Sequence, residues 1–156
     1  MVNYQTLGTY TDMEDIVQNL AEAIDNFLKI EQQNIDWDFK IRKEKWSNKE
    51  IIGHLIDSAQ INLQRFVRCT YEQDFKLVYA QNEWVAASHY QNADIKEVLD
   101  LWILLNRQII RVLINYSEDR LEVTCDTGKT EVQAHSVKWL AEDYVRHMQH
   151  HLDQIA

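Results

Sequence analysis

Residues 47–68, SNKEIIGHLIDSAQINLQRFVR, contain the strongest helical signal in the chain. Ser47 and Glu50 have the spacing of a capping box, in which the serine side chain accepts the Glu50 amide and the glutamate reaches back to the Ser47 amide. Apolar residues then recur at helical spacing to about Arg68. Gly53 interrupts this run, although a glycine inside a helix costs about 1 kcal/mol relative to alanine. Its presence predicts that another backbone or a bulky group lies against it.

Three further segments have the same helical spacing of apolar residues. The first runs from Thr11 to about Ile30 and starts with an N-cap candidate and acidic residues. The second follows the N-cap candidate Asp94 to about Tyr116, and its wide apolar stripe predicts extensive burial. The third follows Ser136 to Ile155. The chain contains no proline and only three glycines, so little interrupts these helices.

The connections are expected to be irregular. Residues 31–46 are dense in charge and suit a link between antiparallel neighbours, with Trp37 and Phe39 tucked against the helices. Residues 69–93 predict a long structured connection with a short turn at 83–87 that packs Trp84. Residues 117–134 permit a small hairpin at most. With 156 residues, 46% of them hydrophobic, the pattern predicts one all-α domain over residues 1–156, a four-helix bundle.

Charge and composition exclude several classes of protein. The net charge of -9 opposes nucleic-acid binding, and the densest basic cluster is interrupted by Glu44. Cys69 and Cys125 lack the spacing of a thiolate metal site, so reduced thiols are expected. The N-terminal segment MVNYQTLGTYTDMED has no signal-peptide pattern, and no run reaches membrane-spanning length. We therefore expect a cytoplasmic protein that does not bind a membrane.

The candidate chemistry begins with His147 and His151. Residues four apart on a helix point the same way, so these two imidazoles can chelate one metal. The pair alone is weak, because six histidines would produce this spacing by chance in roughly one such chain in five. His150 points elsewhere and is expected to face solvent, and His89 and His135 fall in connections.

His54 is the third candidate ligand, because it lies in an apolar helical run that can face His147 and His151 in an antiparallel bundle. The alternative is a hydrogen-bonded core histidine. Three imidazoles from two helices, without an apparent fourth protein ligand, match a catalytic zinc site in which water takes the open position. The same ligands suit nickel or iron.

Other polar residues on these helices have two interpretations each. Asp57 can accept a hydrogen bond from a ligand's ring N–H or act as a general base, or it can be a solvated carboxylate. For Asp143 the solvated interpretation is favoured. Arg65 can anchor an anionic substrate or form a salt bridge within the bundle. Tryptophans 46, 84, 102 and 139 are expected to be packing residues.

Three stretches together resemble the DinB/YfiT-like superfamily of metal-dependent enzymes. They are WSNKEIIGHLIDSAQINLQRF at 46–66, NEWVAASHYQNADIKEVLDLWILLNRQI at 82–109 and DYVRHMQHHLDQI at 143–155. The resemblance implies an up-down-down-up four-helix bundle with His54, His147 and His151 as ligands of zinc or nickel. It also implies a homodimer and a small-molecule substrate. The resemblance does not identify which small molecule this is.

Three functions follow as hypotheses. The first is an enzyme, either a hydrolase acting on a small molecule through metal-bound water or a thiol-dependent S-transferase. In the transferase, Arg65 or Arg68 would hold the carboxylates of a low-molecular-weight thiol. The second is a non-catalytic metal-binding bundle with a structural or partner-binding role. The third is a metal-free interaction domain, in which all three histidines are incidental.

Overall fold

The structure is a computed structural model that describes residues 12–155. Four long helices form it: α1 (Met13–Leu28), α2 (Asn48–Cys69), α4 (Ile95–Ile114) and α5 (Val137–Leu152). The predicted caps of the last three are confirmed, since the side chains of Ser47, Asp94 and Ser136 accept backbone amides there. Asp12 caps α1. The N-cap candidate Thr11 lies outside the described residues, and so does most of the N-terminal segment that was searched for a signal peptide.

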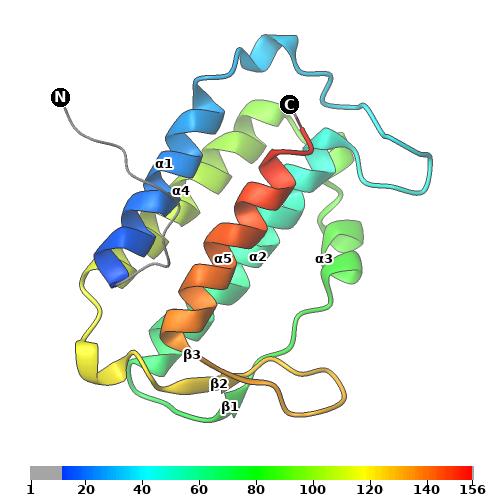
Figure 1. The fold of residues 1–156 in the computed structure, drawn as a ribbon. Coiled ribbons are helices and arrows are strands. Elements are labelled where there is room, and N and C mark those ends of the chain that lie inside the picture. The colour runs from blue at the N-terminus through cyan, green and yellow to red at the C-terminus, as the bar shows by residue number, and fades with distance from the viewer. Residues whose placement is uncertain (1–11, 156) are drawn as a thin grey trace, which may run out of the picture.

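The helices run up-down-down-up, as predicted (Figure 1). Helix α1 packs against α4 and α5, and α2 packs against the same two helices. Because α2 and α4 are parallel, the chain must return along the whole bundle between them. The connection 70–94 does this and carries the short helix α3 (Gln81–Ser88), which packs on α2. Residues 31–46 were expected to link two antiparallel neighbours. They do link two antiparallel helices, but α1 and α2 lie at opposite corners of the bundle rather than side by side.

A small sheet closes the end of the bundle where α2 ends and α5 begins (Figure 1). Strand β2 (Thr124–Asp126) pairs antiparallel with β3 (Ala134–Ser136), which is the expected hairpin. It also pairs in parallel with β1 (Phe75–Lys76), from the connection between α2 and α4. This third strand was not predicted, because two residues carry no periodic signal.

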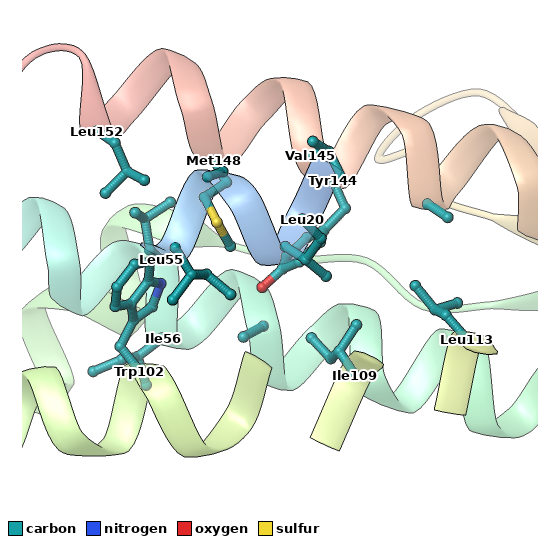
Figure 2. Packing of buried hydrophobic residues seen from close by; sticks show 14 of the residues in the cluster. Leu20, Leu55, Ile56, Trp102, Ile109, Leu113, Tyr144, Val145, Met148 and Leu152 are labelled. Carbon is teal, nitrogen blue, oxygen red and sulfur yellow. The ribbon is translucent and has the colours of Figure 1, made fainter. Parts of the chain in front are cut away.

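The core lies between the four long helices, and Figure 2 shows part of it. Trp102 is fully buried, and the ring of Phe27 meets it edge-on at 5.6 Å. The extensive burial expected for α4 is wrong on one side, where Leu101, Leu104 and Ile114 are exposed. Helix α4 packs mainly on α1 and α2, and it meets α5 inside the core, where the Tyr144 hydroxyl donates to the Asn106 side chain at 2.7 Å. Its outer face has no covering helix within residues 12–155.

The connection between α1 and α2 departs from expectation at one of its two aromatic residues. The Trp37 indole donates to the Gln32 carbonyl and is half-buried, as expected, but Phe39 is 53% exposed rather than tucked against the helices. Trp139 of α5 lies at the rim of the bundle, where it is partly exposed and stacks on His135, in line with the expected packing role. Within residues 12–155 no helix combines the length and the apolar character needed to cross a membrane.

Candidate metal centre

His54 is held in place by the first turns of α2. The Glu50 amide donates to the Ser47 hydroxyl at 3.1 Å, and the Ser47 amide donates to the Glu50 carboxylate at 2.8 Å. This capping box sets where the helix begins and therefore which face His54 occupies. That face is turned toward α5, and the His54 side chain is completely buried.

His147 and His151 lie one turn apart on α5 and meet His54. The Nε2 atoms of His54 and His147 are 3.1 Å apart, and one ligand atom from each of the three histidines lies within 4.8 Å of the others. Two nitrogens bound to a tetrahedral zinc at 2.0–2.1 Å would be about 3.3 Å apart. The three side chains therefore fit a divalent metal, and no fourth Cys, His, Asp or Glu joins this group within the described chain.

Burial keeps these imidazoles neutral. It lowers the pKa of His54 to about 3, with further lowering from charges on His147 and His151. Burial and the neighbouring His151 lower the pKa of His147 to about 4, and burial also lowers the pKa of His151. Only neutral imidazole has a free nitrogen lone pair for a metal, so the group is in its metal-binding form at neutral pH.

Two aromatic residues that the sequence did not single out as site residues orient the His54 ring. Its Nδ1 lies 3.0 Å from the Tyr79 hydroxyl, and the Trp46 indole packs on the ring at a centroid distance of 4.7 Å. If Nδ1 carries the proton and donates to Tyr79, Nε2 is left free to face His147. A ligand histidine is commonly held in this way by a partner on its other nitrogen. Tyr79 comes from an irregular connection, where no periodicity marks it.

Replacing Tyr79 with phenylalanine is expected to weaken metal binding about tenfold, because it removes the hydrogen-bond partner of the His54 ring while keeping the aromatic packing. Metal affinity measured by competition with a chromophoric chelator tests this. Tyr71→Phe is the matched control, since Tyr71 is an exposed tyrosine of the same connection. Equal affinities in the two variants would show that the hydroxyl does not hold His54.

Asp57 is buried rather than solvated. Its Oδ1 accepts a hydrogen bond from the Tyr90 hydroxyl at 2.6 Å, and its Oδ2 has no hydrogen-bond partner among the described residues. Burial raises the pKa of Asp57 to about 6, although the bond from Tyr90 lowers it. The atom facing the outer nitrogen of His54 is the Tyr79 hydroxyl, so the structure does not bring Asp57 to that position.

Gly53 leaves room for the Tyr90 ring. A Cβ atom added at Gly53 would lie 2.1 Å from a ring carbon of Tyr90. The prediction that a bulky group lies against this glycine is therefore confirmed. The same ring carries the hydroxyl that binds Asp57, so the missing side chain at Gly53 lets Tyr90 reach the carboxylate.

The metal-free protein is expected to become less stable as the pH falls from about 6.5 to about 4. The ordinary pKa of histidine is 6.5, whereas in the folded protein the pKa values of His54 and His147 are about 3 and 4. Over this range the unfolded chain binds more protons, so the free energy of unfolding rises with pH. Asp57 acts in the opposite sense between pH 3.8 and about 6, where the folded state holds the extra proton. His54 and His147 against Asp57 leave a dependence of about 1.4 kcal/mol per pH unit, and the lowered pKa of His151 adds to it in the same direction.

Urea unfolding of chelator-treated protein between pH 4.5 and 6.5 measures this dependence. Asp57→Asn is expected to steepen it, because it removes the opposing group. His150→Ala is expected to leave it unchanged, since His150 is exposed. A free energy of unfolding that is constant or increases as the pH falls would contradict the burial of neutral imidazoles.

The other predicted residues lie apart from this group. Arg65 is buried and donates to the Leu77 carbonyl and the Asn62 side chain. It lies eleven residues from His54, about 16 Å along α2. Asp143 is half-exposed and pairs with Arg146, in line with the favoured interpretation. His150 is exposed, as expected, and contacts Gln154, which also contacts His151.

A cavity of about 710 Å³ opens beside His151. Its size falls in the range of small-molecule sites. The lining comes from loop 39–46, the starts of α2 and α3, the last turn of α5 and Gln154 after it. It comprises Phe39, Ile41, Glu44, Lys45, Trp46, Asn48, Ile51, Gln81, Asn82, His151 and Gln154. A small molecule in this cavity can reach the histidine group from the side of His151.

Comparison with solved structures supports this fold. YfiT from Bacillus subtilis, described as a probable metal-dependent hydrolase with an unusual four-helix bundle topology, matches with a TM-score of 0.80 and 18% identity over 97% of this chain and 89% of YfiT. A mycothiol-dependent maleylpyruvate isomerase matches with a TM-score of 0.73 and 13% identity over 92% of this chain and 60% of the isomerase. A protein from Streptococcus pneumoniae matches with a TM-score of 0.64 and 12% identity over 96% of this chain and 92% of that protein.

A search of curated protein sequences gave no significant match. At these identities the solved structures show a shared fold only. The sequence itself provides the family, because the model of the DinB superfamily matches residues 12–155, nearly the entire chain. The chain, with its up-down-down-up bundle and its three-histidine group, belongs to the DinB superfamily.

Proposed function

We propose that this protein is a metal-dependent hydrolase of a small molecule and that His54, His147 and His151 bind one divalent metal, zinc or nickel. The observation that carries the proposal is the convergence of three buried or half-buried imidazoles beside a cavity of small-molecule size. A metal at this position supplies a Lewis acid that brings the pKa of a water molecule toward neutrality.

The residues of the chain have distinct parts in this proposal. His54 and His147 offer their Nε2 atoms, and the Tyr79 hydroxyl holds the outer nitrogen of His54. Asp57 does not line the cavity, so we assign it to holding Tyr90 rather than to activating water. The cavity beside His151 admits the substrate, while complete burial of His54 limits water on the other side of the group.

A thiol-dependent transfer is the second candidate, and the mycothiol-dependent isomerase among the similar folds is what favours it. The two arginines expected to hold the carboxylates of the thiol are engaged elsewhere. Arg65 donates to the Leu77 carbonyl, and Arg68 pairs with Glu72. Lys45 is the cation that lines the cavity, beside Glu44. Hydrolysis is therefore favoured over capture of a thiol that carries several carboxylates.

A purely structural metal is the remaining alternative. Structural zinc sites usually have four protein ligands, and this group has three within the described residues. A structural role also predicts that removing the metal unfolds the bundle, whereas the proposed function predicts a folded, inactive protein.

The test is to strip the protein with a chelator, reload it with zinc or nickel, and measure hydrolysis of a panel of esters and amides with and without added thiol. We expect no turnover after stripping and restored turnover after reloading, without any thiol. Turnover of a thiol and an electrophile only when both are present would favour the transferase. Unfolding on stripping, without activity after reloading, would favour the structural role.

A further inference from the structure

The loop between α1 and α2 carries large apolar side chains that the fold itself does not cover. Phe39 is 53% exposed and Ile41 is 77% exposed. Both line the cavity beside His151, together with Trp46 and with Ile51 of α2. Exposed apolar residues are common when scattered singly, but a group of them around one concave site indicates a binding surface.

The loop is held in shape by its own polar contacts. Lys40 and Ser47 form an antiparallel bridge that closes residues 41–46, and the Asn48 amide donates to the Phe39 carbonyl. The Lys40 ammonium also pairs with Glu50 at 2.6 Å. The apolar wall is therefore built before a ligand arrives, which reduces the entropy lost on binding.

The other wall of the cavity is polar and uncharged. Gln81 and Asn82 lie in the first turn of α3, and no side-chain hydrogen bond occupies either amide among the described residues. Asn48 and Gln154 also line the cavity, but the Asn48 side chain donates to the Asp36 carbonyl and the Gln154 amide contacts His150 and His151. Neutral amide side chains can donate to a carbonyl oxygen and accept from an N–H or O–H group, which suits an uncharged polar group on the ligand.

The charges at the cavity balance. Glu44 and Lys45 are adjacent and of opposite sign, and the described lining contains no further charged side chain apart from the titratable His151. In the metal-free protein a carboxylate or phosphate ligand would therefore find one lysine beside a glutamate, so any preference for an anion would have to come from a metal held by the histidines. An uncharged ligand loses less hydration free energy on entering such a site.

From these two walls we infer that the substrate is an uncharged ester or amide with an aromatic or branched aliphatic group, which packs against Phe39, Ile41 and Trp46 while its carbonyl end faces His151. This inference rests on the proposed function for the reaction. In that reaction one water is consumed: its oxygen bonds to the carbonyl carbon, the C–O or C–N bond breaks, and the leaving oxygen or nitrogen takes up a proton. The products are an acid and an alcohol or amine.

The test measures binding rather than turnover. Four probes are titrated into isotope-labelled protein, with and without zinc, and followed by NMR: phenylacetamide, 3-methylbutanamide, acetamide and phenylacetate. We expect the first two to bind at least about tenfold more tightly than acetamide, which has no apolar group. In the zinc-free protein we also expect them to bind more tightly than the anion phenylacetate, whereas with zinc a carboxylate can bind the metal directly. The side-chain amide signals of Gln81 and Asn82 are expected to shift on binding.

Variants assign the effect to the loop. Phe39→Ala and Ile41→Ala are each expected to weaken phenylacetamide binding about three- to tenfold and to leave acetamide binding unchanged. Val132→Ala is the matched control, because Val132 is also 77% exposed but lies outside the cavity lining. All three side chains are surface-exposed, so these variants are expected to remain folded.

The outcomes separate the two proposals. In the zinc-free protein, acetamide or phenylacetate binding as tightly as phenylacetamide, or no change in Phe39→Ala and Ile41→Ala, would overturn the inference even if the zinc-loaded protein hydrolyses esters. Loop-dependent binding of phenylacetamide to a protein that takes up no zinc would support the ligand class and overturn the proposed hydrolase.

Discussion

Replacing His54 with alanine is expected to weaken metal binding at least about 100-fold and to abolish metal-dependent hydrolysis. His54 is the only one of the three ligands that α2 contributes, and its Nε2 lies 3.1 Å from that of His147. Without His54, only His147 and His151 of α5 remain as ligands, and two ligands hold a metal less tightly than three. Elemental analysis of purified protein, followed by competition with a chelator, measures the loss.

A matched set of variants keeps this result interpretable. His150→Ala removes an exposed histidine from the same helix and is expected to keep full metal content. His151→Ala removes a half-buried ligand and is expected to lose metal with less effect on folding than His54→Ala, because His54 is completely buried. Full metal content in both His54→Ala and His151→Ala would overturn the three-histidine centre.

Replacing Gly53 with alanine is expected to reduce the free energy of unfolding by about 1–3 kcal/mol, the usual cost of overpacking a core. Helix propensity alone predicts the opposite sign, a gain of about 1 kcal/mol. The steric effect is expected to win because the added Cβ would lie 2.1 Å from the Tyr90 ring, far inside contact distance. Denaturant unfolding measures the change.

A double-mutant cycle with Tyr90 identifies the cause. Tyr90→Ala removes the ring, so Gly53→Ala in that background is expected to be neutral or stabilising. A stabilised Gly53→Ala protein with Tyr90 intact would mean that the helix and ring do not meet as closely as described.

The sequence predicted those features that depend on neighbours along one helix. The Ser47 capping box, the Asp94 and Ser136 caps, and the pairing of His147 with His151 each require residues only two to four positions apart. The unusual Gly53 also predicted a close neighbour, although nothing in the local pattern identified that neighbour as Tyr90. The family resemblance added the order of the helices, which periodicity alone does not determine.

Only the tertiary structure decided which residues complete the site. Tyr79 comes 25 positions after His54 from an irregular connection, and its hydroxyl meets the His54 ring because that connection returns along the outside of α2. The buried state of Asp57, the engagement of Arg65 with Leu77 and the exposed face of α4 likewise depend on which elements pack together. Local chemistry along the chain determined the helices and their ligand faces, whereas long-range packing determined burial, and with it the neutral state of the histidines and the shape of the cavity.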